Sequence, residues 1–240
     1  MQLANIYYMF FVYENSSSIY SKFYMLYSLN NMVNKKITSI LEMLKIAEKL
    51  KMELRHSFLS NGRPESSAEH SWRLSLMVLL IAPEVKLKID INKALKMAVI
   101  HDLVEADGYD IPAFEHHRKA EKAKIEEKAA LKYKKLLLSP VGDEIYNLWH
   151  EYEEQETSEA KFIKALDGLE ARLQHNEADI STWNEIEYPR SLYVSDKNCE
   201  IDKFLIELKE EIKAESRKKI TKSGKNLQEV KKEADRLRNN

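Results

Sequence analysis

Apolar residues recur at helical spacing through most of the chain, and capping signals divide the pattern into segments. Ser66 and Glu69 have the spacing of a capping box, which opens an apolar run that ends before Pro83. Asp90 can cap the next apolar segment, and residues 157–180 form another periodic segment downstream. Each of these patterns predicts an α-helix.

The helix predicted after Asp90 carries an inward stripe that includes an acidic residue. The members of this stripe are Leu95, Ala98, Val99, Asp102 and Ala106. An unpaired carboxylate is costly in an apolar core, so Asp102 requires a partner there. Adjacent residues on a helix project about 100° apart, which allows His101 and Asp102 to reach one ion.

His70 and Asp167 lie beside the apolar faces of the other two segments. His70 falls in the first turn after the capping box. Asp167 adjoins a stripe of large apolar residues, and Gly168 after it permits close helix approach. Two neutral imidazoles and two carboxylates can hold one divalent metal and leave coordination positions open for water and a substrate oxygen. These four residues therefore predict a metallohydrolase.

The overall composition favours one helical domain. The chain has 240 residues, 44% of them hydrophobic, and only five glycines and five prolines interrupt it, so long helices with few turns are expected. The net charge of −1 gives no reason to propose a stable nucleic-acid complex. Cys199 is the single cysteine and cannot form an internal disulfide, which favours the cytoplasm.

The two ends of the chain differ from its middle. Residues 1–31 are rich in Tyr, Phe, Asn and Ser, and their apolar run is too short to span a bilayer and lacks the basic flank of a signal peptide. We interpret them as a nonessential extension, with membrane contact as the alternative. Residues 32–222 would form the catalytic domain, and residues 223–240 a charged, frayed tail.

The connecting region between the candidate ligands predicts two further helices. Residues 115–138 are highly charged and suggest a solvated helix that ends before Pro140. Residues 143–154 follow, with a packing face made of Ile145, Leu148, Trp149 and Tyr152.

The ordered set His70, His101-Asp102 and Asp167 resembles the H…HD…D signature of the HD-domain metal-dependent phosphohydrolases. The similarity covers roughly residues 35 to 215 and is strongest to the branch that contains bacterial 5′-deoxynucleotidases. The motifs that carry it are Arg55-His56-Ser57, Glu69-His70-Ser71-Trp72-Arg73, His101-Asp102-Leu103-Val104-Glu105 and Asp110-Ile111-Pro112.

The resemblance implies an all-α fold, a single HD-domain helical bundle with the metal site in its core. It makes His70, His101, Asp102 and Asp167 the ligands of one divalent ion, which could be Mn, Co, Mg, Zn, Fe or Ni. Glu105 would orient or deprotonate the attacking water. Helical spacing agrees, because Glu105 follows His101 by four residues and Asp102 by three.

The resemblance also implies three substrate contacts. Arg55 would hold the phosphate through two parallel hydrogen bonds, although it could instead pair with a neighbouring glutamate at the surface. Asp110 would contact the sugar, although it could be only a turn residue before Pro112. His56 stands where the bacterial enzymes have tryptophan, and Ala113 where they have threonine, so the sugar preference is open.

These observations predict a homodimeric enzyme that hydrolyses nucleoside or deoxynucleoside 5′-monophosphates. One alternative is a cyclic-nucleotide or other phosphodiesterase, in which further histidines would bind a second metal. The candidates are His116, His117, His150 and His175, which we interpret as surface or packing residues, with His150 on an aromatic helix face. The other alternative is a non-catalytic helical interaction module with a structural metal.

Overall fold

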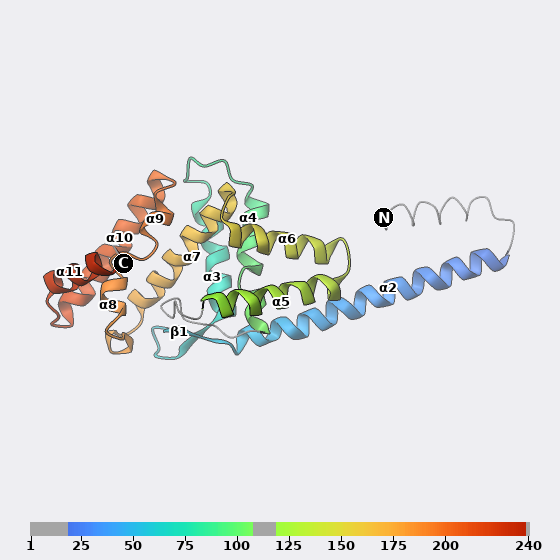
Figure 1. Cartoon of the computed structure of the whole chain (residues 1–240), viewed down its shortest axis with the longest axis horizontal. Helices are drawn as coiled ribbons and strands as arrows, with labels where there is room; N and C mark the ends of the chain where they lie inside the picture. The colour runs from blue at the N-terminus through green and yellow to red at the C-terminus, as the bar shows by residue number, and fades with distance from the viewer. Residues whose placement is uncertain (1–18, 108–118, 239–240) are drawn as a thin grey trace.

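Long helices make up most of the computed structural model, which describes residues 19–107 and 119–238, and one short hairpin lies at its edge (Figure 1). The long helices are α2 (Ile19–Ala47), α3 (Ser67–Ile81), α4 (Ile91–Ile100), α5 (Lys119–Leu137), α6 (Val141–Glu154), α7 (Ser158–Glu177), α10 (Lys203–Lys222) and α11 (Leu227–Arg238). Shorter turns are η1 (Glu48–Lys51), η2 (Leu103–Ala106), η4 (Ile180–Thr182), α8 (Glu187–Arg190) and α9 (Asp196–Cys199). None of the described helices combines the length and hydropathy that a membrane-spanning helix requires.

The three predicted helix starts are confirmed by their caps. The Ser66 side chain accepts a hydrogen bond from the backbone N–H of Glu69, and the Glu69 carboxylate accepts one from the Ser66 N–H. Asp90 caps α4, and Thr157 caps α7. Helix α7 ends at Glu177, three residues before the predicted end.

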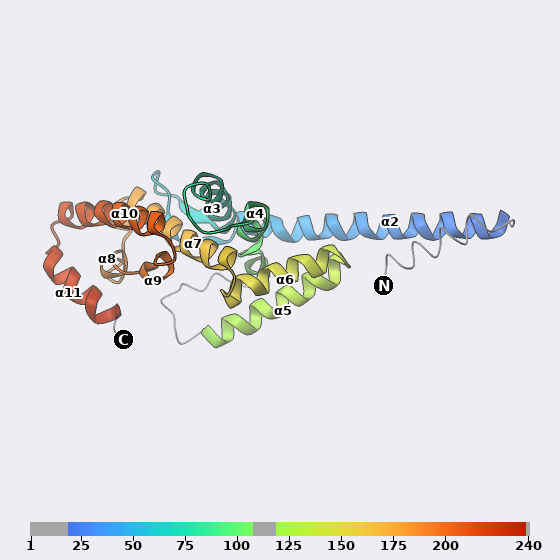
Figure 2. The ribbon, with the colours of Figure 1, turned by 90° about the horizontal axis from the view of Figure 1, so that it is seen from above.

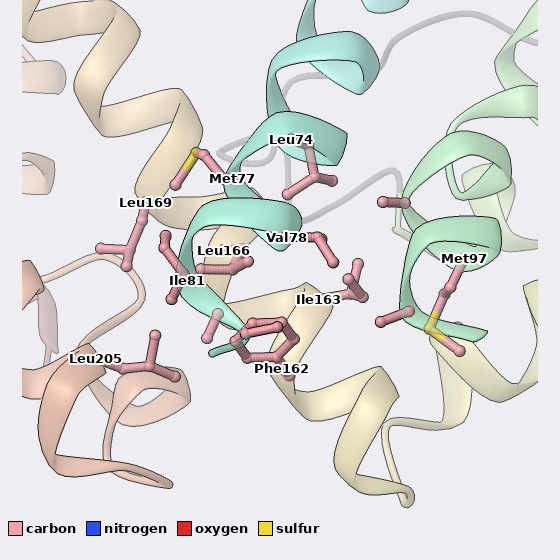
Figure 3. Packing of buried hydrophobic residues seen from close by; sticks show 14 of the residues in the cluster. Leu74, Met77, Val78, Ile81, Met97, Phe162, Ile163, Leu166, Leu169 and Leu205 are labelled. Carbon is pink, nitrogen blue, oxygen red and sulfur yellow. The ribbon is translucent and has the colours of Figure 1, made fainter. Parts of the chain in front are cut away.

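The main core lies where α3, α4 and α7 pack together, with α10 on the other side of α7 (Figure 3). It is filled by fully buried side chains, including Leu74, Val78, Met97, Phe162, Ile163, Leu166, Leu169 and Leu205. Because α7 contacts all three of these helices, side chains around most of its circumference are shielded from solvent.

The predicted inward stripe of α4 is shifted relative to the observed one. Val99 is 57% exposed, whereas Ala94, Met97 and Ala98 are completely buried. Helix α4 contacts α3, α6 and α7. The side of α4 that these three helices cover carries Ala94 and the residues three and four positions after it. Val99 projects about 100° beyond Ala98 and falls outside that side.

A second core joins the C-terminal part of α2 to α5 and α6. Its buried residues include Met43, Leu50, Val104, Tyr133 and Trp149. The packing face predicted for residues 143–154 is confirmed, since Trp149 and Tyr152 are buried and the other two members pack against the cores.

Helix α2 projects beyond this core as a long rod that continues through residue 32 (Figure 2). The division at residues 31 and 222 stays a prediction.

A mostly helical domain is confirmed, but an antiparallel hairpin departs from the all-α expectation. It pairs β1 (Leu54–Phe58) with β2 (Pro64–Ser66), and Gly62 adopts a φ of +83° in the connecting turn. Asn61, Gly62 and Pro64 interrupt the segment between η1 and α3 with turn-forming residues, and the two strands satisfy their backbone groups by pairing. Arg55 and His56 consequently project from a strand.

The prediction of a frayed C-terminal tail is wrong for the described residues. Helix α11 is amphipathic, and Val230 and Ala234 are buried against Trp183, Tyr188 and Ile220. The charged residues that suggested a solvated tail occupy the outer face of this helix.

The capping box should contribute measurably to stability. Ser66→Ala removes the acceptor of the Glu69 N–H and should lower the free energy of unfolding by about 0.5 to 2 kcal/mol in urea titrations. Ser75→Ala is the matched control, because this hydroxyl only bonds the Ser71 carbonyl within α3 and alanine is the better helix former there. Equal stabilities of the two variants would contradict the role of the cap.

Candidate metal centre

The four predicted ligands converge in the core, although they come from three helices. His70 lies in the first turn of α3, His101 and Asp102 directly follow α4, and Asp167 lies in the middle of α7. His70 Nε2 is 3.2 Å from Asp167 Oδ1 and 3.8 Å from Asp102 Oδ2. His101 Nε2 is 3.2 Å from Asp102 Oδ1. The distances leave room for one ion between two imidazoles and two carboxylates.

Hydrogen bonds to the two Nδ1 atoms direct the Nε2 atoms of both histidines toward this centre. His70 Nδ1 contacts the Glu170 carboxylate, and His101 Nδ1 is 2.9 Å from the Ala98 carbonyl oxygen. Carbonyl and carboxylate oxygens only accept, so each Nδ1 carries a proton, and each Nε2 offers a lone pair to a metal once it is itself deprotonated. Both Nε2 atoms are buried, and neither has a hydrogen-bond partner among the described residues.

A divalent cation fits this donor set. Buried polar atoms are normally satisfied, and two lone pairs that face carboxylates call for a positive charge. Ligand atoms of His70, His101 and Asp102 all lie within 4.8 Å of one another. A second group of possible ligands consists of Glu65, His70 and Glu170 and therefore shares His70 with the first. Its two carboxylates are already paired, Glu65 with Arg55 and Glu170 with Arg73.

The electrostatics show how strongly the site favours positive charge. Burial and the Arg55 guanidinium act to lower the pKa of His70, but the carboxylates of Glu170 and Asp167 outweigh them and raise it to about 10. Burial acts to raise the pKa of Asp102, but the charges of His101, His70 and Arg55 lower it overall. The centre therefore holds ionised carboxylates that attract either a proton or a metal.

The second oxygen of Asp167 is held by Tyr152, which the sequence suggested only for packing, and by Lys164, which the sequence had not singled out. The Tyr152 hydroxyl donates to Oδ2 at 2.8 Å, and the Lys164 Nζ donates to the same oxygen at 3.0 Å. Lys164 also donates to the Tyr152 hydroxyl at 2.9 Å. These contacts leave Asp167 Oδ1 facing His70. The i, i+3 spacing of Lys164 and Asp167 was the available signal.

Glu170 and Arg73 form a second missed layer. The Glu170 side chain is fully buried, and besides contacting His70 it accepts from Arg73 Nε at 2.7 Å. Arg73 also donates to Glu177 at 2.6 Å. Each member follows a ligand by three residues, Arg73 after His70 and Glu170 after Asp167, so helical spacing could have indicated both.

Glu105 is buried close to the ligands, but the helical argument that placed it there is wrong. Helix α4 ends at Ile100, and Asp102 leaves the helical conformation with φ −95° and ψ 5°. Glu105 lies in the separate turn η2, where Ser67 donates to its Oε2 at 2.9 Å and Lys122 Nζ lies 3.6 Å from its Oε1. Tertiary contacts, and not one continuous helix face, determine its position.

The hairpin brings Arg55 to the centre and directs His56 elsewhere. Arg55 Nη1 lies 3.3 Å from Asp102 Oδ2, and its Nε lies 3.4 Å from the buried carboxylate of Glu65. Successive strand residues point to opposite faces, so His56 instead contacts Glu187, with its Nε2 3.1 Å from Oε1.

The remaining candidate histidines within the described chain are packing residues. His150 stacks edge-on against Tyr146 and Trp149, which confirms its aromatic helix face. His175 packs against Trp183, and burial lowers its pKa to about 4. Asp110, Ala113, His116 and His117 lie outside the described residues.

Comparisons with known proteins show to which family the chain is similar. The family model described as "HD domain" matches residues 47–209. The chain is 36% identical over 141 residues to the 5′-deoxynucleotidase HDDC2 of Danio rerio, covering 58% of this chain and 69% of the relative. The human HDDC2 is 33% identical, with 58% and 68% covered.

Solved structures share the overall fold. A predicted metal-dependent phosphohydrolase from Magnetospirillum magnetotacticum superposes with a TM-score of 0.66 at 29% identity, covering 77% of this chain and 97% of that one. A conserved hypothetical protein from Pyrococcus furiosus gives a TM-score of 0.56 at 31% identity, with 72% and 99% covered. The chain belongs to the HD-domain family.

Proposed function

We propose that the protein is a metal-dependent phosphohydrolase that acts as a 5′-nucleotidase on deoxynucleoside or nucleoside 5′-monophosphates. The observation that carries this proposal is the pair of buried, unpartnered Nε2 atoms facing two carboxylates, with the Arg55 guanidinium beside them. The names of the HDDC2 relatives and of the Magnetospirillum structure support the substrate class and the metal requirement.

In this proposal His70, His101, Asp102 and Asp167 hold one divalent ion. The bound ion would compensate charge on the phosphate and lower the pKa of a water molecule from about 15.7 toward about 7. The Nδ1 hydrogen bonds of the two histidines orient their rings, and Tyr152 and Lys164 keep Asp167 turned toward the centre with one oxygen. Hydrogen bonds of this kind orient a metal ligand and raise its basicity, so losing them usually lowers the metal affinity.

Arg55 and Glu105 would carry the chemistry contributed by the chain itself. Arg55 can form two parallel hydrogen bonds to phosphate oxygens, which fixes orientation as well as charge. Glu105 would accept a proton from the attacking water as the water oxygen bonds to phosphorus, and it would deliver that proton to O5′ as the phosphorus–O5′ bond breaks, so the nucleoside leaves as an alcohol. Ser67 holds the other carboxylate oxygen of Glu105 in place, so the base is positioned before the substrate arrives.

The sugar contacts assigned to Asp110 and His56 stay predictions. His56 is 34% exposed at its side chain and is engaged with Glu187 and Asn184. A sugar contact from His56 therefore requires a change of its partners. The cytoplasmic location also stays a prediction, which rests on a single cysteine.

The two alternatives have weaker support. The phosphodiesterase alternative needs a second metal, and the second candidate ligand group within the described chain reuses His70. The interaction module with a structural metal does not account for a guanidinium and a buried glutamate placed beside the ligands.

The function test is a substrate panel on the Mn²⁺- and Co²⁺-loaded protein. We expect phosphate release from dAMP and AMP, and no hydrolysis of cyclic AMP, because Arg55 is placed for the free oxygens of a monoester. Asp102→Ala should abolish both bound metal, measured by mass spectrometry, and phosphate release. Hydrolysis of cyclic AMP alone would favour the phosphodiesterase, and metal retained by the variant would remove Asp102 from the ligand set.

Glu105 should separate catalysis from metal binding. Glu105→Gln keeps the shape and the Ser67 contact but loses the base, so turnover should fall by about 10² to 10⁴ while metal content stays at the wild-type level. The comparison is kcat and metal stoichiometry on the same preparation. Near-normal kcat would show that another group manages the proton.

We further propose that the protein forms a homodimer through the outer face of α3. Four large apolar residues at helical spacing are exposed on this face, Trp72 by 68%, Leu76 by 39%, Leu79 by 52% and Leu80 by 64%. Continuous apolar stripes of this kind are typical of interfaces.

Charge on this face should prevent dimerisation. The double variant Leu76→Lys, Leu80→Lys should halve the mass measured by light scattering, because two desolvated ammonium groups cannot be paired across the interface. Lys96→Glu on α4, which changes an exposed side chain, serves as the control. An unchanged mass in the double variant would place the interface elsewhere.

A further inference from the structure

Arg172 is a buried cation without a hydrogen-bonding partner. Its side chain is 3% exposed, and Nε, Nη1 and Nη2 all lack a partner within the described part of the chain. The nearest carboxylate oxygen, Asp196 Oδ1, is 4.0 Å from Nη1, beyond hydrogen-bonding distance. A guanidinium has five N–H donors, and leaving them all unmet in the interior costs several kcal/mol. The fold therefore needs an acceptor at this place.

The surrounding charges do not supply that acceptor. Asp196 is already bound by Lys213, at 3.0 and 3.2 Å, and by Arg238. Glu210 lies 3.5 Å from Lys209, 3.5 Å from Lys213 and 3.6 Å from Arg217. Five cationic side chains thus share two carboxylates. We call the five cations and two carboxylates the Arg172 cluster.

The neighbouring thiol does not balance this charge either. Burial raises the pKa of Cys199 to about 11, so it is neutral at physiological pH. Burial also lowers the pKa of Arg172, the direction expected for a cation without a compensating anion. Lys209 and Lys213 are each only 10% exposed at their side chains, so solvent screens them weakly.

The cluster occupies a different face of α7 from the metal centre. Arg172 follows Asp167 by five residues, which is about 140° around the helix. Helices α9 and α10 pack on this side (Figures 1 and 2). Gly168 allows the close contact, because a Cβ built there would lie 1.7 Å from Ser195 Oγ. The residues around Arg172 are therefore held by tightly packed backbone.

We propose that the Arg172 cluster binds a phosphate group at a second, non-catalytic site. The planar fork of Arg172 matches two phosphate oxygens, and the ammonium groups of Lys209 and Lys213 add charge at close range. A doubly charged, compact anion compensates more of the excess charge than chloride does. The cluster reaches the surface at Arg238 and Glu210, whose side chains are 44% and 48% exposed. This proposal does not depend on the hydrolytic function.

The test is calorimetric titration of the Mn²⁺-loaded Arg55→Ala protein, in which the guanidinium contact proposed for phosphate at the metal centre is removed. The probes are inorganic phosphate, AMP and adenosine, at constant ionic strength set with NaCl. Adding Arg172→Met should weaken phosphate binding at least tenfold. Arg236→Met is the matched control, because it removes an exposed guanidinium of α11 paired only with Glu233, and it should leave the affinity unchanged.

The probes distinguish the source of the phosphate group. Binding of inorganic phosphate identifies the free ion as a ligand, and binding of AMP without inorganic phosphate identifies a nucleotide; either result supports the proposal if it requires Arg172. Binding of adenosine equal to that of AMP, or equal affinities with and without Arg172→Met, would overturn it.

A second measurement covers the case in which Arg172→Met does not fold. Hydrogen exchange of the Arg55→Ala protein should show that phosphate slows amide exchange in residues 193–199 and 209–217 more than fivefold. Sodium chloride at the same ionic strength should not. Unchanged exchange in both segments would reject the site without any substitution at Arg172.

Discussion

Two buried imidazole nitrogens that face two carboxylates are the constraint on which this structure depends. A neutral Nε2 can only accept, and the carboxylates of Asp102 and Asp167 can only accept as well, so the centre needs a proton or a metal ion between these groups. Helices α3, α4 and α7 must meet at one place to create it, and they share the main apolar core. The packing that buries Leu74, Met97 and Leu166 also sets the spacing of the ligands.

The second layer explains why the ligands are presented in one orientation. Glu170 and the Ala98 carbonyl determine which histidine nitrogen is protonated, while Tyr152 and Lys164 engage one oxygen of Asp167. The His101 contact is local to the end of α4, and the others lie within α7 or reach it from a helix packed on it. A buried network of this kind is favourable only when each member is satisfied, which links the site to the integrity of the whole bundle.

Helix α7 carries opposite electrostatic requirements on two of its faces. Around Asp167 the described residues place an excess of acceptors, and around Arg172 they place an excess of donors. Both faces are shielded from water by neighbouring helices, so neither imbalance is relieved by solvation. Helix α7 lies at the centre of the core, and it separates a region that requires a cation from one that requires an anion.

The sequence by itself determined the features that depend on nearby residues. Helix starts at Ser66, Asp90 and Thr157 follow from caps that act over three residues, and the ordered motif identified the family and predicted the ligand set. Tertiary structure decided the exposure of Val99, the strand position of Arg55, the burial of α11 and the contacts of Glu105 and Arg172. Those features depend on which surfaces meet across long stretches of chain. Local periodicity contains no information about that pairing, because the same helical pattern can be buried on any side that a neighbour covers.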